Sequence, residues 1–309
     1  ISLKSGNVVY QFLDKSKYNG YRIHIFKEKW VYVTDENLEF PVDRNDFSVT
    51  VDGTKITFDA VFNAIHGTPG EDGLMQAYFE LLNIPQSSCD YYQAALTFNK
   101  RDLLSVLKPY GIKTATSYYL NQGDVINEEE IINKVGLPCF VKPNKSGSSF
   151  GISKVKTKDE LDYAIVNAYK EDNEIIIESF LDGTEVSVGV INYQGKITVL
   201  PITEIVSEND FFDYEAKYLG KSQEITPARI SDEMTAKVSA VAKRVYEVLK
   251  MTGFSRSEYI IVNGEPHLLE VNTIPGLTTE SLIPQQAKAA GISLTDLFSN
   301  AIELALSKK

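Results

Sequence analysis

A buried strand that runs into a glycine-rich turn and then into a helix most constrains how this chain can fold. The sequence predicts a strand over Asp59–Ile65, a turn over Ile65–Gly73 and a helix over Leu74–Leu82. This order is typical of an open α/β sheet, in which ligands bind at the carboxyl ends of the strands. We therefore predict a mixed α/β fold with α+β elements, and an N-terminal open α/β domain over residues 1–94.

The spacing of apolar residues predicts the remaining elements and two further domains, over 95–180 and 181–309. In the first domain we expect a helix over Ile1–Gln11 and strands over Tyr21–Phe26 and Trp30–Val33. In the second we expect helices over Lys100–Leu107 and Asp159–Tyr169, and strands over Cys139–Lys142, Gly151–Val155 and Glu174–Glu178. In the third we expect strands over Glu185–Asn192 and Ile197–Glu204, a helix from a Ser231 cap to Gly253 and a last helix from Thr295.

The charge balance and the two cysteines limit the partners and the compartment. Lys plus Arg number 31 and Asp plus Glu number 42, so the net charge of −11 disfavours nucleic acids and anionic membranes. A polyanionic ligand would need a local basic site. No apolar run reaches the roughly 18 residues of a membrane span, and no leader is evident at the start. Cys89 and Cys139 are far apart, which fits a reducing cytoplasm.

A hairpin near residue 263 gathers oxygen ligands. The strands Glu258–Val262 and His267–Val271 flank Asn263-Gly264, a strong hairpin turn signal. Side chains two residues apart on a strand point to the same face of the sheet. Glu270 and Asn272 therefore share a face, and so do Arg256 and Glu258. Carboxylate and amide oxygens suit Mg²⁺ or Mn²⁺. The alternative is an Arg–Glu ladder on a solvated face, but the polar turn 273–279 that follows is suited to presenting N–H groups to an oxyanion.

A second polar loop lies between two predicted strands, over Val141–Gly151. Its backbone N–H groups and lysines could hold phosphate oxygens, whereas the alternative is an ordinary hairpin tip. It is not a P-loop. The one Gly-Lys-Ser sequence, at 220–222, has Glu215 where that motif requires its first glycine.

Four segments together resemble the D-alanine–D-alanine ligase family of the ATP-grasp superfamily. They are His66–Gly73, Val141–Gly151, Asp213–Tyr218 and Leu269–Gly276 with Ser281-Leu282, and they cover nearly the whole chain in the family's order. The resemblance implies a three-lobed ATP-grasp fold. It also implies an ATP-dependent ligase that joins two D-alanines through a D-alanyl phosphate for peptidoglycan synthesis. The alternatives are a ligase that uses D-lactate or D-serine as acceptor, and a nucleotide-binding protein without catalysis.

The resemblance also implies which residues bind ATP, the co-substrate. Lys100 and Lys142 match lysines that hold the phosphates, and Lys217 matches a loop lysine that reaches the terminal phosphate. The polar loop Val141–Gly151 matches the family's phosphate-binding flap, and its matching residues are Ser146, Gly147, Ser149 and Phe150. Glu178 and Leu181 match the adenine site, and Glu185 matches the ribose carboxylate.

The same resemblance implies the metal and substrate residues. Glu258, Glu270 and Asn272 match the ligands of two Mg²⁺ or Mn²⁺ ions, and Arg256 and the Gly276 backbone match the groups around the tetrahedral oxyanion. Ser148 and Tyr218, with His66 nearby, match residues that fix the first D-alanine, and Ser281 and Leu282 match the pocket of the second. Both reaction steps develop negative charge, so cations and preorganised donors would carry catalysis.

Three features depart from the family pattern or extend it. Ser179 stands where relatives often have an adenine-side lysine, and Glu258 replaces the more usual aspartate. The stretch Ile1–Gly6 resembles the one that follows the family's glycine-rich first strand and its substrate-binding glutamate, so we expect such a strand to precede it. Relatives are commonly homodimers, so a homodimer is also expected.

Overall fold

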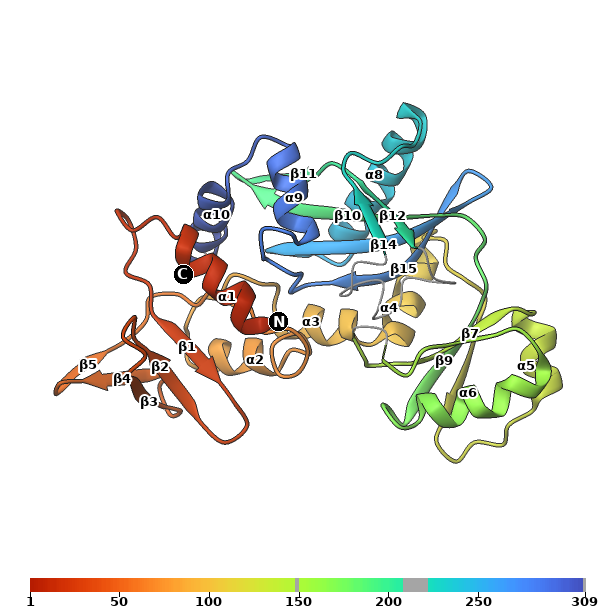
Figure 1. The fold of residues 1–309 in the computed structure, drawn as a ribbon, viewed down its shortest axis with the longest axis horizontal. Helices are drawn as coiled ribbons and strands as arrows, with labels where there is room; N and C mark the ends of the chain where they lie inside the picture. The colour runs from red at the N-terminus through yellow and green to blue at the C-terminus, as the bar shows by residue number, and fades with distance from the viewer. Residues whose placement is uncertain (148–149, 208–221, 308–309) are drawn as a thin grey trace.

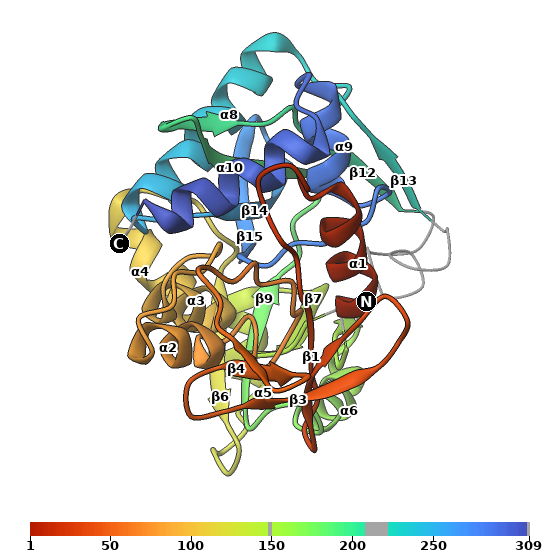
Figure 2. The same ribbon diagram turned by 90° about the vertical axis from the view of Figure 1, so that its left-hand side faces the viewer.

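The fold is built from three sheets. They are arranged around a central pair of helices, α3 (Tyr91–Phe98) and α4 (Lys100–Leu107) (Figures 1 and 2). The computed structural model describes residues 1–147, 150–207 and 222–307. The predicted mixed α/β class is confirmed. The division into domains at 94/95 and 180/181 stays a prediction; residue 94 lies inside a helix, α3.

The first sheet is an antiparallel meander in the order β1-β2-β3-β4-β5, with one helix on each side of it in the chain. Its core contains Phe47 and Phe79, whose ring centroids are 4.9 Å apart. The elements are α1 (Ser2–Phe12), β1 (Arg22–Ile25), β2 (Trp30–Val33), β3 (Glu39–Asp43), β4 (Ser48–Val51), β5 (Thr54–Ile56) and α2 (Leu74–Leu81).

The strand predicted over Asp59–Ile65 is wrong. Of this segment only Val61 pairs, in a single parallel bridge with Gln86. The Val61 N–H donates to the Pro85 carbonyl at 2.8 Å, and the Ser87 N–H donates to the Val61 carbonyl at 3.0 Å. A strand needs a longer ladder than these two bonds. The glycine-rich turn and α2 nevertheless follow it as predicted.

The second sheet is antiparallel in the order β6-β9-β7-β8, and α5 and α6 pack on it through a core that includes Ile131, Leu161 and Ile175. The predicted strands and helices of this region are confirmed, whereas β6, α3 and α5 escaped prediction. The elements are α3 (Tyr91–Phe98), α4 (Lys100–Leu107), η1 (Lys108–Tyr110), β6 (Ser117–Asn121), α5 (Glu128–Val135), β7 (Cys139–Pro143), β8 (Ser153–Val155), η2 (Lys158–Glu160), α6 (Leu161–Ala168) and β9 (Glu174–Ser179).

The third sheet has the order β13-β12-β10-β14-β15, with β11 also paired to β10. The strand predicted over Ile197–Glu204 is two strands, because the segment Leu200-Pro201-Ile202 leaves the ladder and Pro201 has no N–H to donate. The elements are β10 (Thr184–Tyr193), β11 (Lys196–Val199), β12 (Thr203–Ser207), β13 (Ser222–Ile225), α8 (Asp232–Val248), β14 (Phe254–Val262), β15 (Glu265–Asn272), α9 (Leu282–Ala289) and α10 (Leu294–Leu306).

Two cores connect these parts and thereby position the site. Leu103 and Leu107 of α4 share a buried cluster with Val188 of β10 and Leu268 of β15, so α4 is fixed beneath the third sheet (Figure 1). Val9 of α1 lies in a different cluster with residues of α9, α10 and the loop between β15 and α9. The N-terminal helix is therefore packed against the C-terminal part of the chain (Figure 2).

Candidate active site

The hairpin of β14 and β15 carries the centre of the site. Asn263 and Gly264 adopt φ of 50° and 75°, as the predicted turn requires. The strand register places Glu258 opposite Glu270 and Arg256 opposite Asn272. The structure therefore brings together all four residues that the sequence predicted here.

Burial excludes the alternative of a solvated ion-pair ladder at this hairpin. Glu258 is 5% exposed, and an Arg256 Nη2 atom donates to its Oε1 at 2.7 Å. Burial opposes the charge of Arg256, but Glu258, Glu270 and Glu71 raise the pKa of its guanidinium above the ordinary value. The Arg256 Nε is buried and has no hydrogen-bond partner among the described residues. A fixed cation with one unused donor suits a site that receives an anion.

The two predicted phosphate lysines lie on different elements and face this centre. Lys100, at the start of α4, is 9% exposed; its Nζ donates to the Ser146 carbonyl at 2.8 Å and lies 3.6 Å from Glu270 Oε2. Lys142, on β7, donates to Glu178 Oε2 at 2.7 Å. Burial disfavours its charge, but Glu178, with further contributions from Glu270 and Glu185, raises the pKa of the Lys142 ammonium.

The flap after β7 is described only in part. Ser146 Oγ lies 3.5 Å from the Gly147 and Phe150 carbonyls, and Phe150 is 52% exposed. Ser148 and Ser149 lie outside the described residues, as do Lys217 and Tyr218. The predictions made for those four residues stay predictions.

The predicted adenine and ribose residues lie at the ends of β9 and β10. Glu178 is 3% exposed, and its Oε1 has no hydrogen-bond partner among the described residues. Leu181 follows β9 and is half-buried, and Glu185 lies on β10 opposite Ile260. Ser179, where a lysine was expected from the family, uses its Oγ to accept the Thr116 N–H at 3.1 Å. It therefore ties β9 to the segment before β6.

His66 and the loop after β15 form the other side of the site. The His66 Nδ1 lies 2.8 Å from the Ile274 carbonyl, and its Nε2 lies 2.9 Å from Ser5 Oγ. Burial lowers the pKa of the imidazole to about 4, so the ring is neutral near neutral pH. Gly276 lies against Ser281: a Cβ at this glycine would be 2.7 Å from Ser281 Oγ. Leu282 begins α9 and is buried.

Three further residues belong to the site although sequence reasoning missed them. Glu71 accepts the Gly67 N–H at 2.7 Å, and burial raises the pKa of its carboxyl while Arg256 opposes that rise. Glu224 of β13 has its pKa raised by burial and lowered in part by Arg256. Ser5 contacts His66. Glu71 stood within the glycine-rich turn, so its position was a usable signal, whereas Glu224 and Ser5 gave none.

The predicted metal site would consist of oxygen ligands. In the described part of the chain, no three His, Cys, Asp or Glu side chains are grouped so as to hold a metal ion. The predicted set has only two carboxylates, on Glu258 and Glu270, and its third member is the amide of Asn272, whose Nδ2 lies 3.4 Å from Glu270 Oε1. Two carboxylates and an amide oxygen fit Mg²⁺ or Mn²⁺ by their chemistry.

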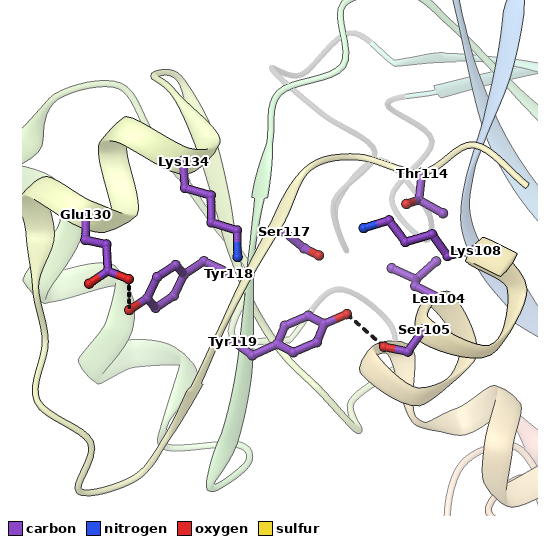
Figure 3. Close-up of a pocket in the computed structure, with 9 residues that line it drawn as sticks. All are labelled: Leu104, Ser105, Lys108, Thr114, Ser117, Tyr118, Tyr119, Glu130 and Lys134. Atoms are coloured by element: carbon purple, nitrogen blue, oxygen red, sulfur yellow. Dashed lines mark hydrogen bonds between the residues drawn. The ribbon is translucent and has the colours of Figure 1, made fainter.

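A separate cavity of about 450 Å³ lies between α4 and the β6–α5 segment (Figure 3). Tyr118 there hydrogen-bonds to Glu130 and Tyr119 to Ser105. None of the predicted site residues lines it.

Within the described ranges, no helix has the length and apolar content needed to cross a bilayer.

Solved structures identify the class of this fold. The chain superposes with a TM-score of 0.85 on a structure named as VanG D-Ala:D-Ser ligase from Enterococcus faecalis, at 32% identity over 98% of this chain and 94% of that one. It superposes with a TM-score of 0.79 on D-alanine–D-alanine ligase from Bacillus anthracis complexed with ATP, at 28% identity over 99% of this chain and 92% of that one. The fold is that of an ATP-grasp ligase.

Sequence comparison then gives the family. Residues 1–89 match the family described as D-ala D-ala ligase N-terminus, and residues 106–303 match D-ala D-ala ligase C-terminus. D-alanine–D-alanine ligase from Flavobacterium johnsoniae is 82% identical over 307 residues, which are 99% of this chain and 95% of that protein. The chain belongs to the D-alanine–D-alanine ligase family.

Proposed function

We propose that this protein is an ATP-dependent ligase that joins two D-alanines into D-alanyl-D-alanine for peptidoglycan synthesis. The observation that carries the proposal is the position of Lys100. Its ammonium contacts the flap through the Ser146 carbonyl and lies beside Glu270 on the predicted metal strand. The phosphate flap, a cation and the predicted metal ligands thus meet at one point, which is what phosphoryl transfer requires.

The reaction has two steps, and neither needs a protein nucleophile. The carboxylate of the first D-alanine attacks the γ-phosphorus of ATP, the bond from that phosphorus to the β–γ bridging oxygen breaks, and ADP leaves an acyl phosphate behind. The neutral amine of the second D-alanine then attacks the acyl carbon, loses a proton and displaces phosphate. Lys100 and Lys142 neutralise phosphate charge, and Arg256 donates to the oxyanion with the Gly276 N–H. The unpaired Glu178 Oε1 is a ready acceptor for the adenine amino group.

Mg²⁺ or Mn²⁺ fits the oxygen donors of the hairpin. Glu258, Glu270 and Asn272 would hold the ions, which when bound neutralise charge on the phosphate chain. Glu258 is longer than the aspartate usual in the family, and here its carboxylate bonds Arg256 at 2.7 Å. We therefore assign Glu258 two tasks, orienting Arg256 and contributing an oxygen to the metal.

The remaining roles follow from the family resemblance. Ser148 and Tyr218, with His66 nearby, would fix the first D-alanine, and Ser281 and Leu282 would hold the second. Leu181 and Glu185 would hold the nucleoside, and Lys217 would reach the terminal phosphate. Cys89 and Cys139 are both buried and neither is in a disulfide, which supports a reducing compartment, the cytoplasm. We also propose a homodimer, which light scattering on the purified protein would test.

The test is phosphate release from ATP by the full-length protein with Mg²⁺. Release that depends on D-alanine, with D-alanyl-D-alanine as product by mass spectrometry, is the expected result. Parallel reactions pair D-alanine with D-serine or with D-lactate, because one structural relative is named as a D-Ala:D-Ser ligase. Formation of D-alanyl-D-serine or D-alanyl-D-lactate in preference to D-alanyl-D-alanine would overturn the acceptor assignment. No D-alanine-dependent release would overturn catalysis and leave a nucleotide-binding protein.

A further inference from the structure

A closed set of hydrogen bonds connects three distant segments beside Gly276. Ser5 comes from α1, His66 from the glycine-rich turn, and Ile274 and Leu277 from the loop after β15. The Leu277 N–H donates to Ser5 Oγ at 3.2 Å, Ser5 Oγ lies 2.9 Å from His66 Nε2, and His66 Nδ1 lies 2.8 Å from the Ile274 carbonyl. We call these four residues the Ser5 circuit.

The chemistry of the partners fixes the direction of every bond in the Ser5 circuit. The Ile274 carbonyl can only accept, so the proton of the neutral His66 ring must be on Nδ1. Nε2 is then an acceptor, and the Ser5 hydroxyl must donate to it. Ser5 Oγ in turn accepts the Leu277 N–H. Each polar atom of the circuit therefore has its partner, although Ser5 is 0% exposed.

The circuit holds both ends of the turn that contains Gly276. Ile274 and Leu277 are three residues apart, and Gly276 lies between them. One end of the turn is held by His66 and the other by Ser5. Ser5 is itself fixed because Val9, one turn further along α1, is packed in the same buried cluster as Leu277. A shift of the Ser5 hydroxyl would therefore be transmitted to the backbone at Gly276.

We propose that Ser5 is a positioning residue for the ligase reaction. Through His66 and the Leu277 amide, Ser5 aims the Gly276 N–H at the oxyanion. His66 acts as a neutral spacer and not as a general base, because its unprotonated nitrogen, Nε2, already accepts the Ser5 hydroxyl. This inference rests on the proposed function. It adds the residue that holds the oxyanion group in place.

The test compares two serines of the same helix in the full-length protein. Ser5→Ala removes the circuit, whereas Ser2→Ala removes a hydroxyl that accepts the backbone N–H of His66 at 3.1 Å and makes no other hydrogen bond among the described residues. For Ser5→Ala we expect kcat to fall on the order of 100-fold, as a donor misplaced by about 1 Å predicts. The KM for ATP should stay unchanged, because Lys100 and Lys142 are not touched. Ser2→Ala should keep the kcat of the unmodified protein.

A second measurement tests the Ser5 circuit in the unmodified protein, so the test holds even if a variant is destabilised. Nitrogen-15 spectra of labelled histidine in the unmodified protein should show His66 protonated on Nδ1 and bare on Nε2, with assignment by His66→Gln among the three histidines of the chain. A proton on Nε2 would overturn the proposal, and so would an unchanged kcat in Ser5→Ala or an equal loss in Ser2→Ala. An unmodified protein without D-alanine-dependent turnover would instead overturn the proposed function.

Discussion

The buried ion pair of Lys142 and Glu178 gives a stability prediction whose size follows from the structure. The two charged atoms are 2.7 Å apart, and the side chains are 14% and 4% exposed. At an effective dielectric constant of about 20, their attraction is about 6 kcal/mol. Removing two ions from water costs several kcal/mol for each ion, so the intact pair contributes little net stability. Loss of one partner is different, because it leaves a buried charge alone.

Lys142→Met should therefore lower the free energy of unfolding by about 3–5 kcal/mol. The measurement is urea unfolding without nucleotide. Lys142→Met with Glu178→Gln should recover most of the loss, because no charge then remains unpaired. The control is Lys145→Met, whose partner Glu174 lies 2.9 Å away but whose pair is 42% and 33% exposed; it should cost less than about 1 kcal/mol. A Lys142→Met loss no larger than the control's would refute the reasoning.

Three further predictions test the metal set, the histidine and the turn. Asn272→Ala should abolish turnover at ordinary Mg²⁺ and restore part of it at high Mg²⁺; normal turnover at ordinary Mg²⁺ would exclude this ligand. Because the pKa of His66 is about 4 when folded and about 6.5 when unfolded, only the unfolded chain gains the proton as the pH falls through that window, so stability declines. From pH 7 to pH 5 this loss should be about 2 kcal/mol, and unfolding of His66→Gln at both pH values should show a decline smaller by that amount. Gly276→Ala places a Cβ 2.7 Å from Ser281 Oγ, so it should lower kcat, and Ser281→Ala should restore part of the rate.

Local signals predicted the elements that local chemistry determines. The Asn263-Gly264 turn and the Ser231 cap, whose side chain accepts the Met234 N–H, both appear as predicted. A similar signal was overlooked at Asp52-Gly53, where φ of 48° and 79° closes the hairpin of β4 and β5. Apolar alternation failed over Asp59–Ile65, because a strand also requires a neighbour along its length.

The candidate site was predictable where its residues share one strand or one motif. Arg256, Glu258, Glu270 and Asn272 could be placed together from a hairpin register. Ser5 could not, because its contact to His66 spans 61 positions in the chain and depends on how α1 packs against the C-terminal helices. Pattern reasoning finds residues that are close in sequence, whereas the second layer of a site is assembled by the tertiary fold.

The charges of the site explain why a divalent cation suits it. The net charge of −11 requires a local basic site for ATP, and the described residues supply Lys100, Lys142 and Arg256. Each of these cations already lies within 4 Å of a carboxylate: Glu270, Glu178 and Glu258, in that order. The cations are therefore neutralised before any phosphate binds. A bound metal ion would add positive charge and let Glu258 and Glu270 hold an anion through it, so nucleotide binding should depend steeply on Mg²⁺. Titration calorimetry with ATP in Mg²⁺ and in chelator would measure that dependence.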